Sequence, residues 1–527
     1  MPRTLLRSRD YRIGNVFLTR YSFLRPYPRP RIKGMTLDAL LHRHAKRQPT
    51  KPAIITVERS ISYAELDDSV TCLARHLLGR GLRPGDRIAV HWSSSIEAAQ
   101  LLLAAFLAGL IAVPINVRLK ALEIAYIFQH AGVRICFSEP AVAPLAKGVE
   151  VVSKMPALNG ASGPLPEVDS DQPAAILYTS GTTARPKGAV HTHHSLFEAA
   201  HMLTPDPVGP ADTVFAVTQL AHVSGLIGIL LPALQQGASA VLLRAFESGA
   251  ALDLIEQFHC TYILALPAML QFIAEEQTRH PRDVSSLRSI VAGGDTVPVS
   301  LQQRVYNLFG ASVLEIHGLT ESCPVMLNPA SAIRAGSIGL PVSGISIRVI
   351  DLHAREVEEG ETGEMLVQSP ANCAGYWNDP KATADLFANG WLRTGDLASR
   401  DADGYYWFKG RLKQLIIRGG SNISPQEVEE ALYQHRAVME AGVIGAPDPV
   451  YGEVPVAFVA VRAGRTITAD ELRAHARELL SDYKVPDRIL FVEALPKGLT
   501  GKIDRRHLRD LLIAQPNLLE QHVEAGF

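Results

Sequence analysis

Apolar and polar positions follow two periods along most of the chain. Residues 36–49 have the spacing of an amphipathic helix that ends at a proline, while 52–58 and 87–92 are short apolar runs typical of strands. Ser62 with Glu65 three residues later forms a capping box, which predicts a helix start. This alternation of helical and strand patterns predicts an α/β chain with a largely parallel sheet.

The pattern changes after about residue 340. Residues 345–367 indicate two strands around a charged turn, and therefore a small β subdomain. Residues 424–435 predict a helix with Ser424 as its N-cap and Pro425 at its first position. Another helix is expected over 467–483, with strands between the two helices. These elements predict a small mobile α+β C-terminal domain beside a large N-terminal domain of mixed and parallel sheets.

Length and composition limit the classes of protein to consider. A chain of 527 residues exceeds one hydrophobic core, and its 52 basic and 53 acidic residues give no argument for a nucleic-acid partner. The five cysteines lack metal-ligand or disulfide spacing, which favours a reducing, cytoplasmic compartment. The uncharged run 98–117 is as long as a membrane span, but its Gln, Gly, Pro and Asn residues favour a buried helix followed by a core strand.

The first residues have a different composition. Residues 1–34 carry eight arginines and Lys33 against a single acid, Asp10. Such an arm is typical of a targeting or membrane-surface segment, and equally of an extended arm lying on the protein, so both interpretations stay open. The expected organisation is a basic arm over 1–34, an N-terminal domain over 35–410, a hinge over 411–414 and a C-terminal domain over 415–527.

Residues 178–193, YTSGTTARPKGAVHTH, have the composition of a phosphate-binding loop. Backbone N–H groups, hydroxyls and an ammonium can converge there on anionic oxygens. The loop does not match the Walker A pattern, and a strand-like run rather than a helix follows it. From these residues alone, a phosphate site and a polar hairpin both stay open. The donors would be Thr179, Ser180, Gly181, Thr182, Thr183 and Lys187.

This loop resembles the phosphate loop of the adenylate-forming superfamily, which includes acyl-CoA synthetases, peptide-synthetase adenylation domains and luciferases. Further segments match in the family's order, and the resemblance extends over about residues 36–510. These segments are LAHVSG (220–225), VAGGDTVP (291–298), EIHGLTES (315–322), GEMLV (363–367), GYW (375–377), WLRTGDLASRDADGYYWFKGR (391–411) and LPKGLTGKIDR (495–505).

The resemblance implies a role for each motif. Thr320 would bind the α-phosphate, and Glu321 would hold Mg²⁺, with Thr179 also approaching the metal. Asp396 would accept the two ribose hydroxyls, with Arg411 beside it. Gly293 and Gly294 would let a backbone approach the adenine, and His317 stands where the family usually has a stacking aromatic ring. Asp295 and Gly318 are further candidate nucleotide-binding residues, with a polar group of the substrate and a cap of the following turn as the alternatives open for Asp295.

Lys502 is the expected catalytic cation. An ammonium between the carboxylate and the α-phosphate reduces the repulsion between these two anions. The resemblance places the hinge at Lys413 and a pantetheine path at Gly419 and Gly420. We count Lys502, Thr320, Glu321 and His222 as the candidate catalytic residues. Two positions depart from the family: Ala184 replaces a usual glycine, and Asp295 replaces a usually small apolar residue.

The resemblance predicts an acid–thiol ligase that uses ATP, Mg²⁺ and coenzyme A. Segments near His222, 265–267, 293–295 and 317–325 carry few charges, which favours a neutral acyl chain, first a medium- or long-chain fatty acid, over a dicarboxylate. The resemblance disfavours an amino acid, because His222 stands where peptide-synthetase adenylation domains have an aspartate for the substrate's amino group. An aryl acid, transfer to a carrier protein and a non-enzymatic nucleotide-binding scaffold are the alternatives. Membrane contact through the basic arm and a homodimer are left open.

Overall fold

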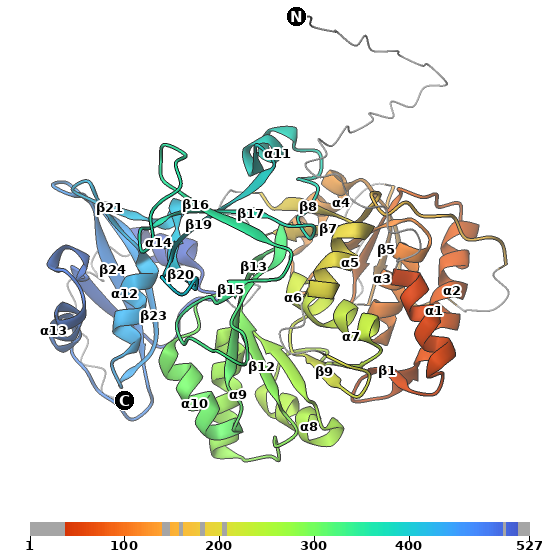
Figure 1. Cartoon of the computed structure of the whole chain (residues 1–527), viewed down its shortest axis with the longest axis horizontal. Coiled ribbons are helices and arrows are strands. Elements are labelled where there is room, and N and C mark those ends of the chain that lie inside the picture. Colours follow the sequence, from red (N-terminus) through yellow and green to blue (C-terminus); the bar gives the residue numbers. More distant parts are fainter. Residues whose placement is uncertain are drawn as a thin grey trace, which may run out of the picture. The chain divides into compact units, whose positions relative to one another are not determined.

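Two sheets with helices beside them make up the first part of the chain in the computed structural model (Figure 1). The structure describes residues 37–139, 148–156, 162–179, 185–202, 208–498 and 502–514. The first sheet has the order β6-β5-β3-β4-β7-β8 in the described residues. All its pairings are parallel except that of β7 with β8. Its strands are β3 (Arg87–His91), β4 (Ile111–Pro114), β5 (Val133–Ser138), β6 (Glu150–Val152), β7 (Pro173–Thr179) and β8 (Lys187–Thr192).

The second sheet has the order β15-β14-β13-β12-β11-β9-β10-β1-β2 among the described residues. Its centre, from β13 to β1, is parallel, and antiparallel strands lie at both edges. The strands are β1 (Pro52–Ile55), β2 (Ser60–Ser62), β9 (Thr213–Ala216), β10 (Ser239–Leu242), β11 (Tyr262–Ala265), β12 (Ser289–Gly293), β13 (Val313–Leu319), β14 (Ser322–Leu327) and β15 (Leu340–Pro341).

Helices accompany these two sheets. Their apolar faces supply much of the N-terminal core, as the burial of Leu66, Leu73 and Leu77 on α2 illustrates. The sequence expectation of an α/β chain with mixed and parallel sheets is therefore confirmed. The helices are α1 (Leu37–Arg47), α2 (Tyr63–Gly79), α3 (Ile96–Leu107), α4 (Ala121–Ala131), α5 (His193–Met202), α6 (Val223–Gly225), α7 (Leu231–Gln236), α8 (Ser248–Phe258), α9 (Pro267–Arg279) and α10 (Val299–Phe309).

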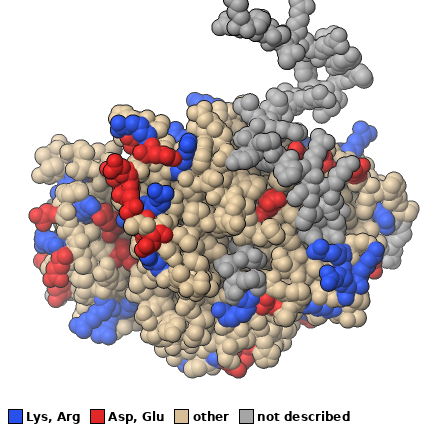
Figure 2. All heavy atoms as spheres, viewed as in Figure 1, with Lys and Arg blue, Asp and Glu red and all other residues tan. Residues whose placement is uncertain are grey.

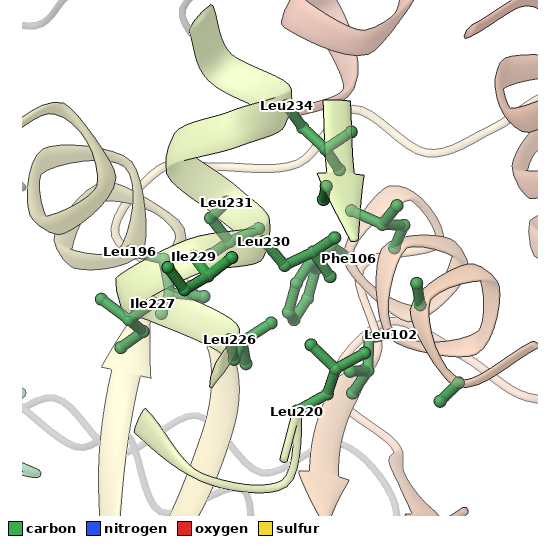
Figure 3. Close-up of a cluster of buried hydrophobic side chains, with 14 of the residues drawn as sticks. Leu102, Phe106, Leu196, Leu220, Leu226, Ile227, Ile229, Leu230, Leu231 and Leu234 are labelled. Atoms are coloured by element: carbon green, nitrogen blue, oxygen red, sulfur yellow. The ribbon is translucent and has the colours of Figure 1, made fainter. Parts of the chain in front are cut away.

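A cluster of buried apolar side chains lies in the middle of this domain. Figure 3 shows Leu102 and Phe106 of α3 pointing toward the turn Leu226–Leu230 and α7. That turn is π-helical, and Pro232 follows it at the start of α7. Proline has no N–H to continue the helical hydrogen-bond ladder, so the ladder is interrupted there. The cluster fixes the chain directly after His222.

A five-stranded antiparallel sheet forms the β subdomain within the described residues. It contains the two strands expected over 345–367, and the short helix α11 (Pro380–Leu386) precedes β18. The strands are β16 (Ser346–Ile350), β17 (Gly363–Gln368), β18 (Phe387–Ala388), β19 (Trp391–Arg400) and β20 (Tyr406–Arg411).

The C-terminal domain has its own apolar core, which includes Val428, Leu432, Val443 and Val459. A 3-10 turn, Leu412–Gln414, precedes it at the position expected for the hinge. Its strands are β21 (Ile416–Arg418), β22 (Ser421–Ile423), β23 (Val438–Asp448), β24 (Gly452–Val461) and β25 (Arg488–Val492). Its helical elements are α12 (Pro425–Tyr433), α13 (Ala469–Leu479), the 3-10 turn Asp482–Lys484 and α14 (Arg505–Ala514).

Several local predictions have a clear outcome. The capping box of Ser62 and Glu65 is present, and the run 98–117 is a buried helix followed by the buried strand β4. No helix in the described ranges is long and apolar enough to cross a membrane. The prediction that Ser424 is the N-cap of α12 and Pro425 its first residue is confirmed, although the Ser424 hydroxyl donates to Gln426 Oε1 at 3.2 Å and makes no capping hydrogen bond to the helix backbone.

The basic arm lies outside the described residues.

On the face drawn in Figure 2, basic and acidic side chains occur in small groups near one another. This distribution agrees with the near-zero net charge of the sequence.

Candidate active site

The phosphate-loop candidate lies between β7 and β8. The two strands pair so that Thr179 stands opposite Lys187, and the Thr179 hydroxyl donates to the Lys187 carbonyl at 3.5 Å. The Lys187 ammonium lies 4.9 Å from the ring centroid of Tyr376, a cation–π distance. The predicted residues Ser180, Gly181, Thr182 and Thr183, together with Ala184, lie outside the described residues.

Thr320 and Glu321 occupy the tight turn between β13 and β14. Two backbone anchors hold it: His191 Nε2 donates to the Thr320 carbonyl at 2.8 Å, and the Cys373 amide donates to the Glu321 carbonyl at 2.7 Å. Burial lowers the pKa of His191 to about 4. The ring is therefore neutral near pH 7, and Nε2 carries its proton because a carbonyl can only accept.

The carboxylate of Glu321 has one fixed partner. Tyr376 donates its phenol hydrogen to Glu321 Oε1 at 2.6 Å. Burial and then the Glu321 charge raise the pKa of Tyr376, so the phenol stays protonated. A carboxylate has about four acceptor sites, which leaves capacity for a cation on Glu321.

Asp396 is the most deeply enclosed carboxylate of the site, with a side chain that is 0% exposed. It lies on β19 opposite Arg411 of β20, whose Nε is 2.9 Å from Oδ1, while His317 Nε2 is 3.1 Å from Oδ2. Burial would raise the pKa of Asp396, but Arg411, His317 and Lys502 outweigh it and hold that pKa below its ordinary value.

The geometry of Asp396 fits a nucleotide. The Arg411 pair lacks the angles of a hydrogen bond, so among the described residues the buried Oδ1 atom has no hydrogen-bond partner. A buried carboxylate oxygen without a donor is costly, and a ribose hydroxyl is a suitable donor. The surroundings of Asp396 therefore fit the ribose of the nucleotide that the sequence motifs imply.

His317 has partners within the protein. Besides pairing with Asp396, its ring centroid is 5.6 Å from that of Phe408 at a tilted angle. Gly293 lies so close to the carbonyl of Ile316 on the adjacent strand that a Cβ would collide with it. The structure thus gives Gly293 a packing reason beside the expected nucleotide approach, while adenine stacking on His317 stays a prediction.

Lys502 comes from the C-terminal domain and lies among these N-terminal residues. A Cβ on Gly294 would be 4.0 Å from Lys502 Cε. Burial lowers the pKa of Lys502, and the carboxylates of Asp295, Asp396 and Glu321 act in the opposite direction, while Arg411 adds to the lowering. The protein therefore gathers acids of three separate motifs around one ammonium.

His222 belongs to the same neighbourhood. Burial, and then the positive charge of Lys502, lower its pKa to about 4, so the imidazole is neutral near pH 7. Its Nδ1 lies 2.7 Å from the Ser224 hydroxyl, which in turn donates to Thr218 Oγ1 at 3.0 Å. His222 thus supplies an uncharged, oriented polar edge to the site.

The residues predicted for the second half-reaction lie elsewhere. Lys413 is in the 3-10 turn Leu412–Gln414, and Gly419 and Gly420 form the turn between β21 and β22 with φ of +54° and +86°. The Gly419 amide donates to the Tyr451 carbonyl at 2.8 Å. All three residues are exposed.

The donor set is compatible with magnesium. Within the described ranges, no group of three or more His, Cys, Asp or Glu side chains could hold a metal ion. A magnesium ion is usually held by one or two carboxylates together with substrate phosphates and water, so the single carboxylate of Glu321 is compatible with it, and the assignment of Glu321 and Thr179 to the metal stays a prediction. When bound, the ion would neutralise charge on the phosphates.

Two family models match the chain. The model described as AMP-binding enzyme matches residues 41–377, and the model described as AMP-binding enzyme C-terminal domain matches residues 427–502. The chain belongs to the adenylate-forming superfamily. It is an acid–thiol ligase of the AMP-forming type, acting on an acyl or aryl acid with ATP, Mg²⁺ and coenzyme A.

Individual members of this superfamily align over nearly their whole length. The chain is 33% identical over 497 residues to the sulfoacetate–CoA ligase of Cupriavidus necator, covering 90% of this chain and 97% of that protein. It is 35% identical over 477 residues to the feruloyl-CoA synthase of Amycolatopsis sp., covering 89% and 97%. The crystal structure of the anthranilate CoA ligase AuaEII in complex with anthranoyl-AMP matches with a TM-score of 0.85 and 28% identity, covering 91% of this chain and 98% of that one.

The sequence alone did not identify Tyr376 or His191 as parts of this adenylate-forming site. Tyr376 holds the Glu321 carboxylate, and His191 holds the backbone of Thr320. Tyr376 lies in the motif GYW (375–377), but the partner of its hydroxyl group depends on pairing between distant segments. The amide of Trp377 donates to Gly188 O and that of Val190 to Gly375 O, which brings Tyr376 against β8.

Proposed function

We propose that this chain converts a medium- or long-chain fatty acid into its coenzyme A thioester through an acyl-adenylate, releasing pyrophosphate and AMP. The observation that carries the proposal is the cluster of the partly buried Lys502 and Glu321 with the buried Asp396, beside the neutral His222. The cluster suits activation of a carboxylate by ATP, and the neutral edge suits an uncharged acyl chain.

The first half-reaction joins two anions. A carboxylate oxygen of the acid attacks the α-phosphorus of ATP, forming a P–O bond while the bond to pyrophosphate breaks. No general base is needed because the nucleophile is already ionised, so positioning and charge neutralisation are the enzyme's main contributions. Lys502 would neutralise the reacting oxygens, Thr320 would bind the α-phosphate, and Asp396 and Arg411 would hold the ribose.

In the second half-reaction the thiol of coenzyme A attacks the acyl carbonyl carbon. A C–S bond forms, the bond from that carbon to the AMP oxygen breaks, and the thiol proton leaves to solvent. We assign Lys413 to the hinge and Gly419 and Gly420 to the pantetheine path, within domain boundaries of 35–410, 411–414 and 415–527. Glycines suit such a path because a backbone without side chains allows close approach.

The fatty acid is supported by the small number of charges among the described residues of the acid side. The segment 265–267 is apolar and buried, and His222 is neutral. An amino acid would leave its ammonium without a counter-charge at His222, which is costly in a desolvated site. The named relatives act on sulfoacetate, ferulate and anthranilate, which differ in charge and ring content, so overall identity does not select the acid.

A pooled acid library tests the proposal. The protein is incubated with ATP, Mg²⁺, coenzyme A and a mixture of fatty, aryl, dicarboxylic, sulfonated and amino acids, and products are identified by mass spectrometry. We expect fatty acyl-CoA as the dominant product. Aroyl-CoA as the dominant product would select the aryl alternative, acyl-adenylate accumulating without thioester would favour a carrier-protein acceptor, and no AMP with any acid would contradict ligase activity.

A further inference from the structure

Asp295 is an acid at a position whose purpose the nucleotide and acid assignments do not explain. It lies on the segment between β12 and α10, directly after Gly294, whose φ is +85°. The amide of Thr296 donates to Asp295 Oδ1 at 3.0 Å. This bond fixes the carboxylate at the start of the segment but leaves most of its acceptor capacity unused.

The groups facing Asp295 come from the C-terminal domain. Its neighbour Gly294 approaches Lys502 Cε, and the Asp295 charge acts on Lys502, Arg505 and Glu429. The backbone of Val299, at the start of α10, is hydrogen-bonded with Glu430 of α12. The segment from Gly294 to Val299 therefore packs along the part of the C-terminal domain that carries these charges.

Arg505 is a nearly buried cation with spare donors. Its Nη2 donates to both oxygens of Glu429, at 2.6 and 2.7 Å, and only 12% and 8% of the two side chains are exposed. Its Nε is buried and has no hydrogen-bond partner among the described residues. Glu429 thus balances the Arg505 charge, while Lys502 has no such dedicated carboxylate within its own domain among the described residues.

Asp295 supplies the missing negative charge from the other domain. Burial lowers the pKa of Lys502, and Asp295 is the carboxylate that opposes this effect most, ahead of Asp396 and Glu321. Gly294, directly before Asp295, lies beside Lys502 Cε, so the Asp295 carboxylate is close to this cation, and a nearby carboxylate stabilises the arrangement in which the cation stays there.

We propose that Asp295 is a positioning residue that holds Lys502 and Arg505 of the C-terminal domain against the nucleotide site for the adenylation half-reaction. This inference rests on the two-step reaction proposed above. Thioester formation does not need Lys502 at that place, so the loss of Asp295 affects the first half-reaction and spares the second.

The test compares two substitutions at Asp295 with a distant control. Asp295→Asn keeps the shape and removes the charge, Asp295→Glu keeps the charge, and Glu359→Gln removes one charge from an exposed turn. Pyrophosphate release is measured in single turnover with an accepted acid, and thioester formation is measured from preformed acyl-adenylate and coenzyme A. We expect Asp295→Asn to slow adenylation about tenfold, within the range of interaction energies between members of one charge network.

The same variants are expected to differ in a way that a simple packing defect would not produce. Asp295→Asn retains the thioester rate and the Michaelis constant for the acid, and Asp295→Glu and Glu359→Gln retain adenylation. Limited tryptic cleavage at Arg411 and Lys413, without substrates, is expected to be faster in Asp295→Asn because the two domains are held together less firmly. This readout needs no catalysis.

Each other outcome overturns the proposal. Unchanged adenylation in Asp295→Asn removes the positioning role, a changed Michaelis constant for the acid alone assigns Asp295 to acid binding, and equal loss of both half-reactions makes it structural. A wild-type protein that forms no acyl-adenylate contradicts the proposed function instead. In that case the tryptic comparison still decides the domain contact, because equal cleavage of all variants contradicts it.

Discussion

The proposed nucleotide side and acid side of the site differ in charge. Around Lys502 the protein gathers Glu321, Asp396 and Arg411, and Arg411 is paired with Asp396 at 2.9 Å. On the other side lies the neutral imidazole of His222. The residues that follow it, from Leu226 onward, pack in the apolar cluster of Figure 3. The contrast separates a charged reaction site from an uncharged binding site.

This difference explains why the reaction is easier to identify than the acid. Charged and hydrogen-bonding groups discriminate strongly because a buried polar group left without a partner is costly. Apolar walls discriminate weakly, since one methylene changes binding by only about 1–3 kcal/mol. Relatives can thus keep one reaction while accepting different acids.

The largest expected effect is on Lys502. Lys502→Ala is expected to slow adenylation by about 10² to 10³, as for the loss of one group that stabilises charge in a transition state. Thioester formation from preformed acyl-adenylate should continue, because no phosphorus is attacked in that step. Rapid-quench measurement of each half-reaction checks this.

Lys497 offers a matched control for that prediction. It lies on the same hairpin, where the Gly498 amide donates to the Lys502 carbonyl, but its ammonium pairs with Glu440 at 2.6 Å. Lys497→Ala should retain both half-reactions. Equal losses of adenylation in Lys502→Ala and Lys497→Ala would contradict a specific role of Lys502 in adenylation.

A smaller effect is expected at the ribose position. Asp396→Asn leaves Arg411 without its ion pair and removes an acceptor for hydroxyls, so the Michaelis constant for ATP should rise about tenfold. The constant for the acid should not change. Steady-state kinetics with each substrate varied checks this, with Asp403→Asn, an exposed partner of Arg334, as control. A rise for the acid instead would mean that the two sides are not separate.

The smallest effect is expected on the apolar side. Leu266 is buried, and its Cδ2 would be 3.0 Å from a Cβ on Gly294. Leu266→Ala should lower kcat/KM for the preferred acid about fivefold, within the range for lost methylene contacts. A longer acid should lose less, while the constant for ATP stays unchanged. Competition among acids of increasing length measures it, and an equal loss for all acids would argue against an acid contact.

Much of the fold could be predicted because local patterns and tertiary packing agree in it. The capping box of Ser62 and Glu65 and the buried pair of α3 and β4 follow directly from sequence spacing. Ser424 shows what such local rules leave open. The serine before a helix-starting proline is the N-cap as predicted, but its hydroxyl donates to Gln426, a partner that the rule does not specify.

The site divides in the same way. Lys502, Glu321 and Asp396 could be proposed from motif residues, and the structure brings them together. Tyr376 and His191 could not be given their partners, because each contact joins segments far apart in the sequence. Such contacts depend on strand pairing, which a linear pattern does not contain.

Oxygen transfer from the acid to AMP tests the central claim most directly. An accepted acid labelled with ¹⁸O in its carboxylate is incubated with ATP, Mg²⁺ and coenzyme A, and the AMP is analysed by mass spectrometry. If the carboxylate attacks the α-phosphorus, each AMP formed carries one carboxylate oxygen, and the pyrophosphate carries none. Unlabelled AMP, or label appearing in pyrophosphate or inorganic phosphate, would contradict the acyl-adenylate route.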